Sequence, residues 1–223
     1  MTTRTRFHEA LDNLKCKMLV LGGMAENAVE QAVHAHRERA PELCHKVFEN
    51  EVRINVTSRE IDELALDLLA RQQPMAVDLR FILGVIKGNA DLERVGDQAV
   101  NIAERVMALV ELPPAELAAD IPQMATAALE MVQQSLQAFV SGEADLAQRI
   151  LERDDSVDQM NHEIFTAMDR TMEVSPQFLR QALHTISIAR NLERVADHAT
   201  NIAESAIFWV RGNDSRRRFR IAV

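Results

Sequence analysis

The 223-residue chain lacks most of the residues that build β-sheets, disulfide frameworks and membrane spans. It has no Tyr and one Trp, aromatic residues make up only 4% of it, and Gly (7) and Pro (6) are scarce. No segment reaches the roughly 18 uncharged apolar residues that a membrane-spanning helix needs. Ala, Leu, Glu, Arg, Met and Gln dominate instead, and these residues favour helices. Composition therefore predicts an all-α protein, with enough hydrophobic residues (47%) for a buried core.

Cysteine usage and charge limit the compartment and the partners. Cys16 and Cys44 form neither a Cys-x-x-Cys pair nor a disulfide framework, which favours a reducing cytoplasm. The N-terminus has no apolar stretch followed by a cleavage site, so we expect no signal peptide. The formal net charge of −9 argues against nucleic acid as the main partner. Only the tail at residues 216–220 is basic; it suits an anionic membrane surface or an acidic partner, although a solvated terminus is the simpler interpretation.

An internal repeat is the strongest signal in the sequence. Residues 92–104 read LERVGDQAVNIAE and residues 192–204 read LERVADHATNIAE, so ten of thirteen positions are identical at an offset of 100. An earlier segment recurs at an offset of 103, where Glu51, Ile54, Asn55 and Glu60 correspond to Asp154, Val157, Asp158 and Glu163. The change of offset falls between helices, as a difference in loop length would produce. Duplication of one unit explains this pattern.

Each unit is predicted to contain three helices. In the first, apolar residues recur at spacings of three and four over residues 7–28, which indicates a long helix. Pro41 suits the first turn of a second helix, because its missing N–H is no loss there. Pro74 ends that helix, and a third helix follows over about residues 77–110.

Turn and helix-breaking residues divide the second unit in an equivalent way. Ser141-Gly142 separates its first two helices, Pro176 opens the third, and Gly212 ends it. Pro113-Pro114 marks the boundary between the units. Long helices joined by short turns pack antiparallel, so we predict two tandem three-helix bundles, residues 1–112 and 113–223.

Acidic and amide side chains recur on the third helix of each unit. In the pattern Glu-x-x-x-Asp-x-x-x-Asn, three side chains stack on one helical face. The members are Glu93, Asp97 and Asn101 in the first unit, and Glu193, Asp197 and Asn201 in the second. The second helices add Glu51 and Asn55, and Asp154 and Asp158. Toward the N-terminus the same face of the first unit becomes apolar, through Leu79 and Leu83, which predicts a packing surface.

Clustered carboxylates of this kind point to metal ions. Acids four residues apart repel each other by about 0.2–0.5 kcal/mol on an exposed helix. Divalent or trivalent cations relieve this repulsion, since hard cations prefer carboxylate oxygens completed by amide oxygen and water. The alternative is a network of salt bridges, but Arg94 and Arg194 follow their glutamates directly and so point about 100° away round the helix. We therefore favour metal sites for iron, manganese, zinc or magnesium over salt bridges alone.

No catalytic motif accompanies these acids. The sequence has no GxSxG, Walker loop, Gly-rich dinucleotide turn or Cys-x-x-Cys. Glu42-x-x-His45 has the spacing of a ferritin-like di-iron site, but the second unit has no counterpart. His184 and His198 occur only in the second unit and are interpreted as surface or boundary residues. The residues favour a protein that is not an enzyme, and a carboxylate-bridged, metal-dependent enzyme such as an oxidase or phosphohydrolase stays open as the alternative.

The doubled LERV-x-D-x-x-x-NIAE motif, preceded in the first unit by QQPMAVDLR, resembles the PhoU family over essentially the whole chain. This resemblance implies two three-helix bundles side by side in a cytoplasmic protein that associates with the inner face of the membrane and often forms homodimers. It also implies a negative regulator of the phosphate regulon. Such a regulator is an adaptor between the ATPase of a phosphate ABC transporter and a sensor histidine kinase.

The family's metal motif, E(D)xxxD, corresponds in this sequence to Glu51/Asn55, Glu93/Asp97, Asp154/Asp158 and Glu193/Asp197. Two positions depart from a strict repeat. Asn55 stands in place of an acid, and Asn191 stands where the first unit has Asp91. Because the second group has one more acid than the first, we expect it to bind a cation more tightly.

Overall fold

The computed structural model of the chain describes residues 3–212, and all regular structure in that range is helical. The basic tail at residues 216–220 lies outside the described residues. The first unit contains α1 (Thr3–Glu38), α2 (Pro41–Gln72) and α3 (Ala76–Val110). The second contains α4 (Ile121–Ser141), α5 (Ala144–Leu151), α6 (Asp154–Val174), a 3₁₀ turn η1 (Pro176–Phe178) and α7 (Leu179–Arg211). The predicted all-α class is confirmed, and no described helix has the length and low charge needed to cross a bilayer.

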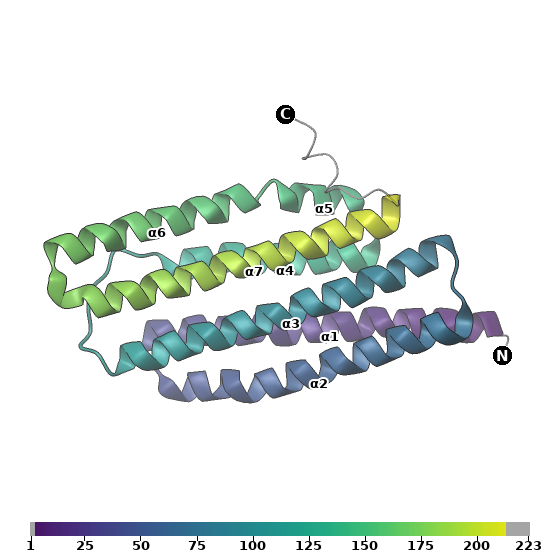
Figure 1. Cartoon of the computed structure of the whole chain (residues 1–223), viewed down its shortest axis with the longest axis horizontal. Coiled ribbons are helices and arrows are strands. Elements are labelled where there is room, and N and C mark those ends of the chain that lie inside the picture. The colour runs from purple at the N-terminus through teal and green to yellow at the C-terminus, as the bar shows by residue number, and fades with distance from the viewer. Residues whose placement is uncertain (1–2, 213–223) are drawn as a thin grey trace.

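The third helix of each unit packs against the other helices of its own unit. α3 contacts α1 and α2, and α7 contacts α4, α5 and α6. The most extensive contact in the molecule joins the two units through α3 and α7, which run in opposite directions (Figure 1). α1 and α4 also touch across the same junction. Two three-helix units therefore share one seam, with α2 and the α5–α6 pair on its outer sides (Figure 1).

The repeat is visible in the pattern of burial as well as in the sequence. Buried positions in α1 recur in α4 at an offset of 103, the offset that also relates the second helices. They are Met18, Leu21, Ala25, Ala28, Val29 and Ala32, which correspond to Ile121, Met124, Ala128, Met131, Val132 and Ser135. The residues that end the two helices correspond too, since Arg39 (φ 51°) and Gly142 (φ 75°) are both left-handed. Equivalent helices thus occupy equivalent places, which confirms two tandem bundles.

One expected helix is broken. The second helix of the second unit was predicted to be continuous, but Glu152 and Arg153 form a turn between α5 and α6. Arg153 donates from its guanidinium to Glu130 Oε2 (2.8 Å) on α4, and Ser156 Oγ donates to the carbonyl of Arg153 (2.6 Å). Asp and Ser side chains compete with helical backbone hydrogen bonds and favour helix starts, so Asp154-Asp155-Ser156 begins a new helix. The equivalent Glu-Val-Arg at residues 51–53 lets α2 continue.

The apolar stripe that leads to the carboxylates was expected to be a packing surface. This expectation is wrong, because the leucines of the stripe are exposed. Leu79 and Leu83 are 38% and 37% exposed, and their counterparts Leu179 and Leu183 are 46% and 50% exposed. Neighbouring helices instead cover the adjacent face of α3, where Ile82 is completely buried. Apolar residues surround much of these helices, so periodicity alone could not decide which face is covered.

Beside the first carboxylate group, α2 and α3 approach closely at Gly96. A Cβ atom at Gly96 would lie 3.0 Å from Ile54 Cδ1 and 3.2 Å from its Cγ2. The second unit has Ala196 and Val157 at the equivalent positions, both buried. The first unit pairs glycine on its third helix with the larger isoleucine on its second helix. The second unit pairs the larger alanine with the smaller valine, so the two units fill the same space with different side chains.

This exchange predicts a favourable coupling between Gly96→Ala and Ile54→Val. Alanine gains up to about 1 kcal/mol of helix propensity, but against Ile54 it also crowds the interface. Ile54→Val alone costs about 0.5–1.5 kcal/mol and makes room for the new methyl group. We expect denaturant unfolding of the four proteins to give a coupling free energy of about 0.5–3 kcal/mol in favour of the double variant.

Gly23→Ala is the matched control, because a Cβ atom there meets nothing within 4 Å. It should stabilise the protein equally in the presence and in the absence of the Ile54→Val substitution. Additivity of Gly96→Ala with Ile54→Val would show that the two units do not use compensating volumes at this contact.

Candidate functional site

The carboxylates of the second unit come together where α6 begins beside the middle of α7. Burial is the main cause that raises the pKa of Asp154 to about 6, from an ordinary value of 3.8. The charges of Asp158 and Asp197 raise it further, followed by those of Asp155 and Glu193. Asp154 Oδ1 is buried and has no hydrogen-bond partner among the described residues. These acids are therefore close enough to destabilise each other's charged forms.

The pKa values of the carboxylates on α7 are raised for the same reasons. Burial raises the pKa of Glu193 and of Asp197, and the charge of Asp158 raises both further. Arg194 opposes this effect at both positions without cancelling it. One polar contact reaches the group from α6, where the Asn161 amide donates to Glu193 Oε2 at 2.6 Å. A cation placed among these carboxylates would relieve this repulsion.

In the first group, two of the acids have partners within the group itself. Arg94 Nη1 lies 3.2 Å from Asp97 Oδ2, and the Asn55 amide donates to Glu51 Oε1 at 2.6 Å. The expectation that Arg94 points away from the acidic face is therefore wrong: it turns to the acid three residues ahead, not to Glu93 beside it. Asn55 Oδ1 is buried and finds no partner among residues 3–212, which leaves one oxygen available for a ligand.

The asparagines that end each stripe bond to other groups. The Asn101 amide donates to Gln98 Oε1 at 3.4 Å, and the Asn201 amide donates across the seam to Asp91 Oδ1 at 3.1 Å. His198 Nδ1 also lies 3.0 Å from Asp91 Oδ1, so His198 is a boundary residue, as interpreted. Sequence reasoning missed the role of Asp91, which ties α3 to α7. Its replacement by asparagine in the second unit was the available signal.

Among residues 3–212, no three His, Cys, Asp or Glu side chains are placed to hold one metal ion together. Metal binding at the ten predicted positions therefore stays a prediction, and the second group is the better fit. Beside it opens a cavity of about 520 Å³ lined by Gln98, Arg194, Asp197, His198, Thr200 and Asn201. The only hydroxyl in this lining, on Thr200, donates to the carbonyl of Asp197 at 2.7 Å. That hydroxyl is not bonded to a base that would activate it as a nucleophile.

Comparison with known proteins decides the family. The PhoU domain model matches residues 18–106 and 121–206, one match in each unit. The chain belongs to the PhoU family. A PhoU homolog of Pseudomonas aeruginosa, named a phosphate-specific transport system accessory protein, is 35% identical over 95% of this chain and 88% of its own length. A PhoU homolog of Thermotoga maritima is 32% identical over 99% of this chain and 95% of its own.

Solved PhoU structures share the fold. The crystal structure of PhoU from Pseudomonas aeruginosa matches with a TM-score of 0.88 at 35% identity, covering 93% of this chain and 100% of that one. The phosphate transport system regulatory protein PhoU from Streptococcus pneumoniae matches with a TM-score of 0.86 at 27% identity, covering 93% and 98%. The family and the fold expected from the doubled motif are both confirmed.

The raised pKa of Asp154 predicts how stability depends on pH in this PhoU protein. Because the folded-state pKa is about 6, above the ordinary 3.8, the folded state holds a proton that the unfolded chain has already released. The contribution of Asp154 to stability therefore falls as pH rises through this window and stays low above it. Asp154→Asn should raise the midpoint of thermal unfolding of chelator-treated protein by about 2–4 °C near neutral pH. This gain should vanish near pH 4.

Asp169→Asn, an exposed position further along α6, serves as the control and should change the midpoint little at either pH. A gain from Asp154→Asn of the same size at both pH values would contradict electrostatic repulsion as its cause.

Proposed function

We propose that this chain is an accessory and regulatory protein of a phosphate transport system. The observation that carries the proposal is the family match in both units, together with relatives that align over nearly the whole of both chains. Those relatives are named as phosphate-specific transport system accessory proteins, and a solved relative is named as a regulatory protein. Since the likeness spans both units, the function belongs to the complete two-unit architecture.

In detail, we propose a negative regulator that acts as an adaptor. It would contact the ATPase of a phosphate ABC transporter and a sensor histidine kinase, as a homodimer at the cytoplasmic face of the membrane. Exposed leucines support a docking role, because they lie on α3 and α7 on the same stripes as the carboxylates. An apolar patch next to charged groups is typical of protein–protein contacts. The alternative, a metal-dependent enzyme, is less well supported because the relatives are named as accessory and regulatory proteins.

Metal binding is part of this proposal. Asp154, Asp158, Glu193 and Asp197 would hold a cation such as iron, manganese, zinc or magnesium, and would no longer repel one another. Glu51, Asn55, Glu93 and Asp97 would hold a second cation more weakly, because Arg94 already competes for Asp97. Bound cations would supply local positive charge on a chain of formal net charge −9, which favours contact with acidic partners or anionic lipid.

Metal loading should therefore distinguish the two groups. After chelation and dialysis against manganese or zinc, elemental analysis should find that Asp154→Asn/Asp158→Asn loses the more tightly held metal. The variant Glu93→Gln/Asp97→Asn should retain it and lose only the weaker site. Equal metal content in the wild type and both variants would exclude the carboxylate groups as ligands.

The regulatory role is tested in cells that carry a phosphate-starvation reporter. Deletion of the chain should raise reporter expression in phosphate-rich medium, because the kinase is no longer held inactive. A folded variant with Glu93, Asp97, Glu193 and Asp197 changed to Gln or Asn should fail to restore repression and should bind the kinase or ATPase more weakly in pull-downs. Wild-type behaviour of the deletion strain would refute the regulatory role. Full activity of the neutral variant would show that the carboxylates are not the docking face.

A further inference from the structure

A second polar site lies away from the carboxylates, at the end of the seam where the chain leaves α3. It is a cavity of about 270 Å³ between the end of α1, the end of α3, the linker at residues 111–120 and the start of α7. No carboxylate of the described part of the chain lines it. Its polar lining consists of His36, Arg37, Arg39, Gln181 and Thr185, set among apolar residues of α3 and the linker.

The opposite end of the seam is filled by aromatic side chains that pack on one another. There Phe81 packs on Phe139 with ring centroids 5.7 Å apart and meets the edge of Trp209 at 5.3 Å. Gly142, at the end of α4, leaves room for this cluster, since a Cβ atom there would lie 3.0 Å from the Trp209 ring. An aromatic cluster thus closes that end.

Internal symmetry places the cavity at the equivalent end. At offsets of 100 and 103, Phe81 corresponds to Gln181, Phe139 to His36, Trp209 to Leu109, and Gly142 to Arg39. Thr185 likewise stands where the first unit has the buried Val85. At the aromatic end of the seam, apolar side chains fill the space between the helices. Burying polar side chains at the other end costs free energy unless they find hydrogen-bond partners. Gln181 and Thr185 find such partners within the fold, because the Thr185 hydroxyl donates to the carbonyl of Gln181 at 3.0 Å and the Gln181 amide donates to the carbonyl of Pro113 at 3.2 Å. Packing leaves His36 and the remaining donors of Arg39 unexplained, and a ligand would explain them.

Arg39 is held in place and still has donors to offer. Its Nη2 donates to the carbonyls of Leu109 (2.7 Å), Val110 (3.2 Å) and Leu112 (2.5 Å) at the end of α3. Nε and Nη1 make no hydrogen bond within the described residues. The end of a helix carries about half a negative charge, and the Arg39 guanidinium exceeds it even though Arg37 is paired with Glu38 at 2.9 Å. The cavity therefore carries net positive charge.

The other polar groups of the cavity supply hydrogen-bond donors but no carboxylate. Arg37 contacts its neighbour Glu38 through Nε at 2.9 Å, and that carboxylate does not line the cavity. Burial and the charge of Arg39 lower the pKa of His36, so at neutral pH its ring donates one N–H. The Gln181 amide donates to the carbonyl of Pro113 at 3.2 Å, which ties the linker to α7 beside the cavity.

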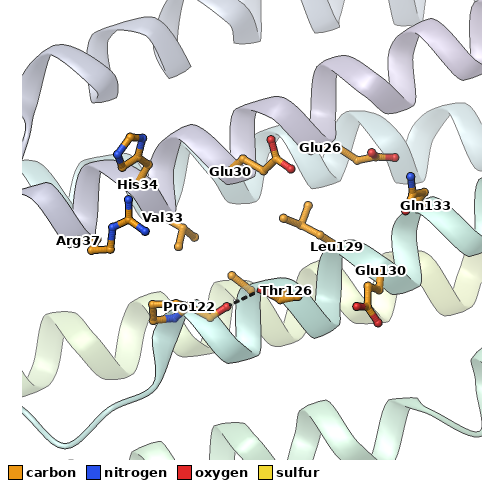
Figure 2. A pocket seen from close by; sticks show the side chains of 11 residues that line it. Glu26, Glu30, Val33, His34, Arg37, Pro122, Thr126, Leu129, Glu130 and Gln133 are labelled. Carbon is orange, nitrogen blue, oxygen red and sulfur yellow. Dashed lines mark hydrogen bonds between the residues drawn. The ribbon is translucent and has the colours of Figure 1, made fainter.

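Acidic side chains gather instead in the adjoining cavity of about 380 Å³ between α1 and α4. Arg37 lines both cavities, and Figure 2 shows it at the end of α1 beside His34, with the carboxylates of Glu30 and Glu26 further along that helix. Glu130 adds a third acid from α4. These acids disfavour an anion in that cavity, so an anion is expected only on the far side of Arg37.

We propose that the cavity at the end of α3 binds a phosphate-type oxyanion, held by Arg37 and Arg39 with a hydrogen bond from His36. Guanidinium groups match the geometry of phosphate oxygens and form charge-assisted hydrogen bonds with them. The volume of about 270 Å³ is just below that of clefts for drug-sized ligands, roughly 300–1,000 Å³, so it suits inorganic phosphate or a small phosphate monoester. The choice of phosphate among oxyanions rests on the proposed function, whereas the anion site rests on the cavity itself.

Binding of an anion in this cavity would be coupled to the arrangement of the two units. The lining comes from both units and from the linker between them, so a bound anion holds the two units in this arrangement. A ligand that binds only this arrangement stabilises it in proportion to its concentration. A regulator of phosphate transport would thereby respond directly to phosphate.

Calorimetric titration of the full-length protein with inorganic phosphate tests the site, with sulfate and glycerol phosphate as parallel arms at constant ionic strength. We expect saturable binding of phosphate, weakened about tenfold or more by Arg37→Gln, since a hydrogen bond to a charged group is lost. His36→Phe should weaken binding several-fold, because it removes the N–H donor and restores the residue type found at the equivalent position 139. Arg149→Gln, an exposed arginine on α5, is the control and should leave affinity unchanged.

Arg39→Lys keeps the charge but loses the contacts to three carbonyls, so its stability is checked by thermal unfolding before its affinity is interpreted. Tighter binding of glycerol phosphate than of phosphate would support the site and identify a monoester as its ligand. Absence of saturable phosphate binding, or equal affinity in the wild type, Arg37→Gln and His36→Phe, overturns the proposal. Equal affinity for sulfate and phosphate overturns the assignment to phosphate.

The same variants separate this inference from the proposed function. Arg37→Gln should derepress the phosphate-starvation reporter partially in phosphate-rich medium, while Arg149→Gln should not. Phosphate binding in vitro with no effect of Arg37→Gln on the reporter, where deletion has its full effect, would overturn the regulatory role of the site. An unresponsive deletion strain would refute the proposed function and leave phosphate binding in vitro standing.

Discussion

The antiparallel contact between α3 and α7 is the constraint on which the rest of the structure depends. It joins the two units through the most extensive helix contact in the molecule and sets which faces of these helices are covered. Asp91 reinforces it by accepting from Asn201 and contacting His198 across the seam. The basic cavity takes its position from this contact, because its lining comes from the end of α3 and the start of α7. A change in the angle between α3 and α7 would therefore alter the cavity.

Duplication makes each unit a control for the other. Ile54 and Gly96 in one unit occupy the space that Val157 and Ala196 occupy in the second, which is compensation between two packing partners. The ends of the seam differ in another way, because aromatic residues at one end are replaced by basic and polar ones at the other. The first difference preserves a core and the second opens a cavity. The comparison separates side chains that packing requires from side chains that packing does not explain.

Electrostatics also differ between units that are alike in sequence. The acids around Asp154 raise one another's pKa, whereas Asp97 is paired with Arg94. The break between α5 and α6 places Asp154 at the start of a helix, where the helix dipole favours the charged carboxylate, but burial and the neighbouring acids outweigh this effect and raise the pKa of Asp154. A repeated motif thus yields two sites of different charge, and a cation would have a larger effect on the second. The asymmetry suits a regulator whose two units need not respond to the same ligand.

The sequence by itself determined the helical class, the duplication and the family, because periodicity and a motif repeated at a constant offset are properties of the chain alone. It also predicted that carboxylates line one face of α3 and α7, since spacing along a helix is local. The tertiary structure decided which faces are buried, that Arg94 reaches Asp97, and that Asp91 bonds across the seam. It also brought the end of α1, the linker and α7 around one cavity, although His36 and Gln181 lie far apart in sequence. Such contacts depend on how helices pack, and side chains that look equivalent along the chain become different only when their neighbours are in place.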